Sequence, residues 1–68
     1  MKRYYVNKNR QSNGDHEVHH ENCTFLPKEE NRIFLGTFSS CHAAVREAKT
    51  HYSQSNGCKY CSIECNTQ

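Results

Sequence analysis

Two short stretches, His19-His20-Glu21-Asn22-Cys23 and Cys58-Lys59-Tyr60-Cys61, dominate this chain of 68 residues. The first places three residues between a histidine and a cysteine, and the second places two residues between two cysteines. Each spacing lets a single turn of chain supply two ligands along one edge of a tetrahedron, which is the usual arrangement of a structural zinc site. The predicted ligands of one Zn²⁺ are His19, Cys23, Cys58 and Cys61.

Neighbouring residues offer alternatives to this ligand set. Either His16 or His20 could replace His19 as the nitrogen ligand. Cys65 follows Cys61 after three residues and could join the site, although we expect it to be a free thiol near the metal. Cys41 falls on the apolar face of a predicted helix, where a small buried thiol is ordinary core.

The composition explains why such a chain would need a metal. A sequence of 68 residues, 1–68, corresponds to one domain. In this size range the surface buried on folding is only marginally sufficient for stability. Only ten residues are Leu, Ile, Val or Phe. The net charge of +2 does not force disorder by self-repulsion. A structural zinc is the kind of contribution that would stabilise the fold.

The number of cysteines and the first residues favour a reducing environment. Five cysteines cannot all pair, and residues 1–6 run into a polar stretch without the apolar segment of a secretory signal. No apolar run approaches membrane-spanning length. We therefore expect a cytoplasmic monomer that has no contact with a membrane and whose thiols bind metal rather than form disulfides.

Three strands are predicted in the first half of the chain. Arg3–Lys8 is a strand around Tyr4-Tyr5-Val6, and 9–15 has turn chemistry with the reversal-prone pair Asn13-Gly14. Glu17–His20 would complete a hairpin, and Arg32–Phe38 forms a third, more apolar strand.

The second half predicts one helix and a turn. Ser39 is a good N-cap, and a helical stripe follows on one face. Its members are Cys41, Ala44, Val45, Ala48 and Tyr52. Residues 53–57 end the helix in turn-forming residues before the Cys58 pair. The predicted fold class is α+β: a small antiparallel sheet of two or three strands, one packed helix and a C-terminal zinc knuckle.

The order of these features over 18–61 resembles the metal-binding domain of the Ada methyl-acceptor protein. The likeness rests on His19-x-x-x-Cys23, a strand, a helix with alanines at packing spacing, and Gly57-Cys58-x-x-Cys61. It implies the fold and the zinc. In Ada a Cys-x-x-x-Cys takes the first place, and its first cysteine is a nucleophile that accepts a methyl group from a DNA phosphotriester. His19 stands there in this chain, so the resemblance does not imply the repair activity.

The segment between the two ligand pairs is longer here than in Ada, so the DNA contacts of that family are not carried over. The pattern is also similar to short bacterial proteins of unknown function that are built only of this module. The resemblance therefore bears on the fold and the metal and leaves the partner open.

The residues His16-Glu17-Val18-His19-His20 also satisfy the His-Glu-x-x-His pattern of zinc proteases. That mechanism needs both histidines on one face of a helix, but Asn13-Gly14 precedes the stretch and no apolar helical stripe accompanies it. A shell of one histidine and three cysteines leaves no open position for water or substrate. We therefore expect that the protein is not an enzyme.

Three kinds of binding function remain. A nucleic-acid-binding module would use basic side chains on phosphates and the tyrosines Tyr4, Tyr5 and Tyr60 on bases. The candidate phosphate contacts are Arg3, Lys8, Arg32, Arg46, Lys49 and Lys59. The alternatives are a protein-interaction adaptor and a redox or metal sensor that uses Cys65 or a ligand thiolate. The sequence favours a zinc-stabilised module that contacts nucleic acid.

Overall fold

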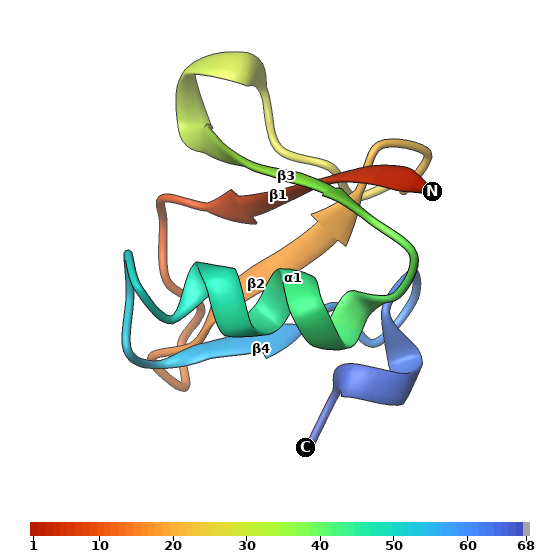
Figure 1. Cartoon of the computed structure of the whole chain (residues 1–68). Coiled ribbons are helices and arrows are strands. Elements are labelled where there is room, and N and C mark those ends of the chain that lie inside the picture. The colour runs from red at the N-terminus through yellow and green to blue at the C-terminus, as the bar shows by residue number, and fades with distance from the viewer. Residues whose placement is uncertain (68) are drawn as a thin grey trace.

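The computed structural model describes residues 1–67. Four strands, one α-helix and two short 3-10 helices follow one another along these residues (Figure 1). Their bounds are β1 Lys2–Asn7, β2 His16–His20, η1 Glu29–Asn31, β3 Arg32–Phe38, α1 Cys41–Ala48, β4 Ser55–Gly57 and η2 Ile63–Cys65. The α+β class is as predicted, and the strands predicted from Arg3, Glu17 and Arg32 onward are β1, β2 and β3.

The strands form one mixed sheet in the order β3-β1-β2-β4. Strand β1 is antiparallel to both β2 and β3, whereas β4 runs parallel to β2. The prediction of a purely antiparallel sheet of two or three strands is therefore wrong. The missed strand is Ser55–Gly57, whose residues are typical of turns, and it is extended because it pairs with His16, Glu17 and Val18.

The sheet has an inner face, which packs on α1, and an outer face. Tyr4, Val6 and Val18 point inward and are buried. On β3 two residues, Leu35 and Gly36, lie opposite Tyr4, so the register shifts by one residue there. Gly36 has a φ of +134°, a conformation that glycine adopts without strain. The shift lets Leu35 reach the core.

Helix α1 lies across the inner face and contacts all four strands (Figure 1). Its N-cap is Ser40, one residue later than predicted, and the buried face consists of Cys41, Ala44 and Ala48. The helix ends at Ala48, yet Tyr52 still packs against the core beyond its end. No helix within residues 1–67 combines the length and the apolarity that crossing a membrane would require.

The hydrophobic core is small even for this composition. Of the ten Leu, Ile, Val and Phe residues, only Val6, Val18 and Leu35 are buried. Phe25, Phe34 and Ile63 are largely exposed. So little aliphatic burial stabilises a domain of this size only weakly, which makes cross-links or metal ligation important for the fold.

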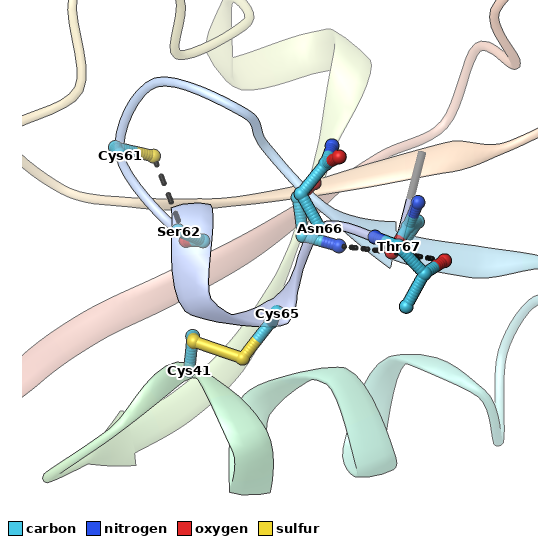
Figure 2. The surroundings of a disulfide bond; sticks show 8 residues. Cys41, Cys61, Ser62, Cys65, Asn66 and Thr67 are labelled. Carbon is cyan, nitrogen blue, oxygen red and sulfur yellow. Dashed lines mark hydrogen bonds between the residues drawn. A yellow bond between two sulfur atoms is a disulfide. The ribbon is translucent and has the colours of Figure 1, made fainter.

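A disulfide joins the start of α1 to the C-terminal segment. Cys41 and Cys65 are bonded to each other (Figure 2). The expectations that Cys41 is a simple core thiol and that Cys65 is a free thiol are therefore wrong. Gly57 lies beneath this segment, where an added Cβ would be 2.6 Å from the carbonyl oxygen of Ser62 and 2.7 Å from Cβ of Cys65. Only a residue without a side chain lets η2 approach β4 this closely.

Candidate metal centre

The metal-binding atoms of His19, Cys23, Cys58 and Cys61 all lie within 4.8 Å of one another. The Nδ1 atom of His19 is 3.5 Å from Sγ of Cys23 and 3.9 Å from Sγ of Cys61. The Sγ atoms of Cys23 and Cys58 are 4.0 Å apart. In a tetrahedral zinc site the edges are about 3.8 Å between two sulfurs and about 3.6 Å between nitrogen and sulfur. The cluster therefore fits one tetrahedral metal ion.

The parallel pairing of β2 with β4 brings the two halves of the cluster together. Val18 is the register partner of Gly57, and the N–H of Cys58 donates to the carbonyl of Val18 at 3.0 Å. His19 follows Val18 and Cys58 follows Gly57, so the two candidate ligands lie side by side on neighbouring segments. The missed strand β4 is the element that positions the ligand pairs.

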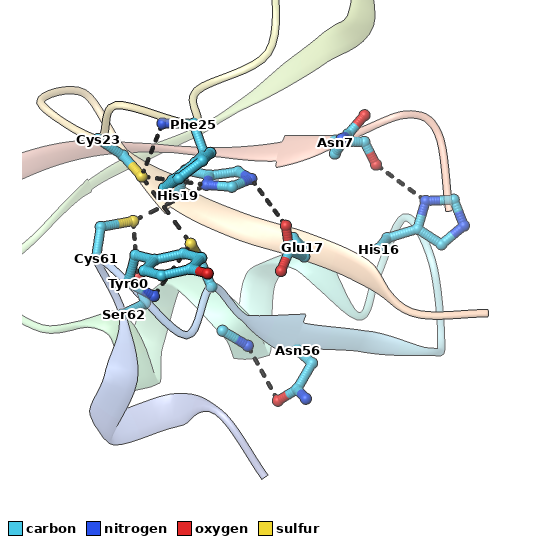
Figure 3. A network of polar contacts seen from close by, with 12 residues as sticks. Asn7, His16, Glu17, His19, Cys23, Phe25, Asn56, Tyr60, Cys61 and Ser62 are labelled. Atoms are coloured by element: carbon cyan, nitrogen blue, oxygen red, sulfur yellow. Dashed lines mark hydrogen bonds and ion pairs between the residues drawn. The ribbon is translucent and has the colours of Figure 1, made fainter. Parts of the chain in front are cut away.

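A tight turn then supplies the second ligand of each pair. The N–H of Cys23 donates to the carbonyl of His20 at 3.1 Å, and the N–H of Ser62 donates to the carbonyl of Cys58 at 2.9 Å. These turns point the sulfurs of Cys23 and Cys61 back toward the ring of His19 (Figure 3). His19 and Cys58 are each only 1% exposed.

Backbone amides and aromatic rings support the sulfurs. The N–H of Phe25 donates to Sγ of Cys23, and the N–H of Tyr60 donates to Sγ of Cys58, both at 3.4 Å. Such donors stabilise thiolate charge. The Phe25 and Tyr60 rings stack with centroids 4.5 Å apart, and both remain more than half exposed. The two turns thus meet through an aromatic pair next to the cluster.

The far side of the His19 ring faces a carboxylate. Nε2 of His19 lies 3.6 Å from Oε1 of Glu17 and makes no shorter contact, so it is the one buried side-chain polar atom without a hydrogen bond within residues 1–67 (Figure 3). If a metal were bound at Nδ1, the ring proton would be on Nε2, next to the carboxylate of Glu17. A carboxylate behind a ligating imidazole is the usual support of a metal site. The sequence showed Glu17 only as part of the rejected protease pattern.

The surroundings of the three thiols shift their pKa values in different directions. Burial raises the pKa of Cys23 and of Cys58. Burial also acts to raise the pKa of Cys61, but hydrogen bonds with His19 and Cys23 outweigh it and lower that pKa. Of the three thiols, Cys61 is therefore the one that gives up its proton most readily. A bound cation would displace the remaining protons.

The three alternative ligands lie elsewhere. The ring of His16 stacks on that of Tyr52 at 3.8 Å, and its Nδ1 is 2.9 Å from the carbonyl oxygen of Asn7. Nδ1 of His20 accepts a hydrogen bond from the N–H of Asn22. Cys65 is held in the disulfide. The structure thus brings none of these atoms into the cluster, and the stretch that matches the protease pattern is a strand rather than a helix.

The predicted phosphate contacts are spread over separate surfaces. Arg3 and Arg32 line one hollow on the outer face of the sheet. Arg46 and Lys49 are exposed at α1, which covers the inner face. Lys59 lies 5.2 Å from the centre of the Tyr60 ring, and the exposed Lys8 directly follows β1. Of the three tyrosines expected to stack on bases, Tyr4 is buried in the core.

Comparison of the chain with models of protein families, with curated proteins and with solved structures gives no match in any of the three. The likeness to the Ada domain therefore rests on ligand spacing and element order alone. The chemistry of this chain has to be inferred from its own residues.

Proposed function

We propose that the protein is a small zinc-stabilised binding module in which His19, Cys23, Cys58 and Cys61 hold one Zn²⁺. The observation that carries the proposal is the convergence of one imidazole nitrogen and three sulfurs within 4.8 Å, from two segments that are far apart in sequence. Sulfur and imidazole ligands in a tetrahedral arrangement are typical of zinc. The small core supplies little stability, and metal ligation would add to it by holding β2, β4 and the C-terminal turn together.

The proposed role of the zinc is structural. Four protein ligands complete the tetrahedron and leave no position for water or substrate, so we infer that the module is not an enzyme. His19 stands where a methyl acceptor of the Ada type would need a nucleophilic cysteine, and an imidazole cannot replace a thiolate in that chemistry. Function then belongs to the surface of the module.

The surface function that we propose is contact with nucleic acid. Its support is the pairing of basic side chains with aromatic rings, at the partly exposed Arg32 beside Tyr5 and at the exposed Lys59 beside Tyr60. Base stacking and phosphate contacts need this combination. The proposal takes the module as a monomer.

A second candidate function is contact with a protein. The stacked Phe25 and Tyr60 rings are 55% and 63% exposed and lie on the two ligand turns, where they could form an aromatic anchor. The sensor hypothesis has less support, because Cys65, one of its two candidate thiols, is already bonded to Cys41. The cytoplasmic location was expected partly because the thiols were expected to be reduced, and the disulfide removes this ground. The location stays a prediction.

The decisive experiment is native mass spectrometry of the purified protein with and without a strong chelator, alongside circular dichroism of the same samples. We expect one zinc per chain and loss of structure when the metal is removed. The disulfide must be kept oxidised in both samples, so that metal loss is the only difference between them. A chain that purifies without metal and stays folded would contradict the proposal.

A further inference from the structure

A group of aromatic and basic side chains lies on the outer face of the sheet, next to the candidate metal centre but separate from it. There Tyr5 of β1 is the direct register partner of Phe34 of β3, and their ring centroids are 5.5 Å apart. Phe34 is 53% exposed although it lies in the middle of a strand. Together with Tyr5 it forms an aromatic pair on the surface, and an apolar patch of this kind, unlike a single exposed ring, can mark an interaction site.

Two arginines accompany the aromatic pair. The guanidinium carbon of Arg32 lies 4.6 Å from the centre of the Tyr5 ring, and its Nη1 donates to the carbonyl of Pro27 at 2.8 Å. Arg32 is therefore held in place against the ring. Arg3, two residues before Tyr5 on the same face, is exposed. We call the four residues Arg3, Tyr5, Arg32 and Phe34 the aromatic platform.

The platform lines a hollow of about 400 Å³ with one acidic residue, Glu29, at its border. Two guanidinium groups against one carboxylate leave the hollow with a positive balance. The ligand that matches this charge and these flat apolar rings is an anion that carries planar aromatic groups. A nucleic acid strand with unpaired bases has both properties, because each base offers a ring face and each linkage a phosphate.

We infer that the aromatic platform binds single-stranded nucleic acid, with bases stacked on Phe34 and on the Tyr5–Arg32 layer and with Arg3 placed for a phosphate. Open sheet faces with exposed aromatic side chains read unpaired bases in this way, and guanidinium planes also serve as stacking surfaces. A duplex offers no free base faces except at its ends. This inference rests on the proposed nucleic-acid function and names its surface and the form of its ligand.

The test is fluorescence anisotropy of labelled single-stranded and duplex DNA of equal length with the zinc-loaded full chain at low salt. We expect the single strand to bind at least tenfold more tightly than the duplex. Phe34→Ala should weaken single-strand binding by about tenfold, as expected for loss of one stacked base. Phe34→Trp should preserve it. Phe34→Leu keeps an apolar contact without a ring face and should behave like the alanine variant.

A charge-matched pair of double variants locates the phosphate contacts. Replacement of both Arg3 and Arg32 with glutamine should weaken single-strand binding and reduce the slope of log affinity against log salt by about 0.7, the value for the one phosphate contact assigned to Arg3. Replacement of Arg46 and Lys49 with glutamine removes the same amount of positive charge, but from the surface around α1. This double variant should leave the affinity and the slope unchanged. Zinc content and circular dichroism establish that each variant is folded.

The remaining outcomes separate this inference from the function on which it rests. Single-strand binding that Phe34→Ala leaves unchanged, or that the α1 double variant abolishes, would overturn the platform while nucleic-acid binding stands. Preference for the duplex would do the same. No binding to either DNA, or to a single-stranded RNA of the same length, would overturn both and leave a protein as the partner of this face. Mass spectrometry decides separately whether zinc is bound, and the binding assays use the zinc-loaded chain throughout.

Discussion

Tyr5 on β1 and His19 on β2 are direct partners across the sheet and point to the same outer face. The imidazole of the candidate metal centre thus adjoins the ring at the middle of the aromatic platform. Ligation of His19 would fix β2 beside β1, and so would fix the surface on which Tyr5 lies. A metal that only stabilises the fold would in this way still control the affinity of the neighbouring surface.

The choice of His19 as nitrogen ligand leads to the first prediction. His19→Cys should keep one zinc per chain, because a fourth thiolate satisfies the same tetrahedron. Cys58→Ser should lose the metal and much of the fold. His20→Asn should keep the metal, since the ring of His20 lies outside the cluster. Native mass spectrometry of the three variants decides, and zinc loss in His20→Asn alone would place the nitrogen ligand at His20.

The carboxylate of Glu17 leads to the second prediction. Glu17→Ala should weaken zinc binding by about 10- to 100-fold, because the His19 ring would lose the carboxylate that lies 3.6 Å from its Nε2. Glu17→Gln keeps an oxygen acceptor without the charge and should fall between wild type and alanine. Glu21→Ala is the matched control, since that side chain bonds to the backbone of Arg3 instead. Competition with a coloured chelator measures the affinities, and equal values for Glu17→Ala and Glu21→Ala would contradict the role.

The disulfide leads to the third prediction. A double change of Cys41 and Cys65 to alanine should lower the free energy of unfolding by about 3–4 kcal/mol, given the sequence separation of 24 residues that the bond spans. Zinc binding should survive, because neither sulfur belongs to the cluster. Urea denaturation of the zinc-loaded proteins gives the difference. A loss of zinc on this change would mean that the C-terminal segment needs the bond in order to present Cys61.

The buried Tyr4 leads to a prediction about alkaline pH. Burial raises the pKa of Tyr4 above 10.0, and negative charge at Cys61 and Glu64 acts in the same direction. Below about pH 10 the phenol is neutral in both states, and the full stability is present. Above that pH the unfolded chain ionises first, so stability falls until the pH passes the folded pKa.

Tyr4→Phe should therefore flatten the decline in stability above pH 10 relative to wild type. Tyr60→Phe, a change at an exposed position, should retain the decline because Tyr4 is still present. Urea midpoints measured between about pH 9 and pH 12 compare the three proteins. A steep decline that persists in Tyr4→Phe would assign the alkaline sensitivity to another group.

Local signals were sufficient for most of the fold. Alternating apolar residues located β1 to β3, and the stripe that starts at Cys41 located α1. Strand β4 was not predicted, because Ser, Asn and Gly favour turns. Only the pairing with β2 makes Ser55–Gly57 extended. Tyr52 fits the helical stripe but lies beyond the end of α1. Its side chain still packs against the core, which does not require helical backbone.

The clustering of His19, Cys23, Cys58 and Cys61 was predictable, because short spacings encode the turns that present their side chains. The Cys41–Cys65 bond was not, since two cysteines at a sequence separation of 24 carry no local signal of contact. The sequence places Phe34 within an apolar strand but does not show that its ring is exposed. Alternation within β3 points Leu35 inward, so Phe34 must face outward with Arg32, which only the sheet register reveals.

The division of the five cysteines has a chemical consequence for how the chain matures. Three sulfurs belong to the cluster and the other two are joined to each other. A chain that takes up its ion before it meets an oxidant offers that oxidant a single available pair, Cys41 and Cys65. The ion then serves as a protecting group in the sense of synthetic chemistry, because it masks three thiols while the remaining two are oxidised. Oxidation in the reverse order would scramble the pairs.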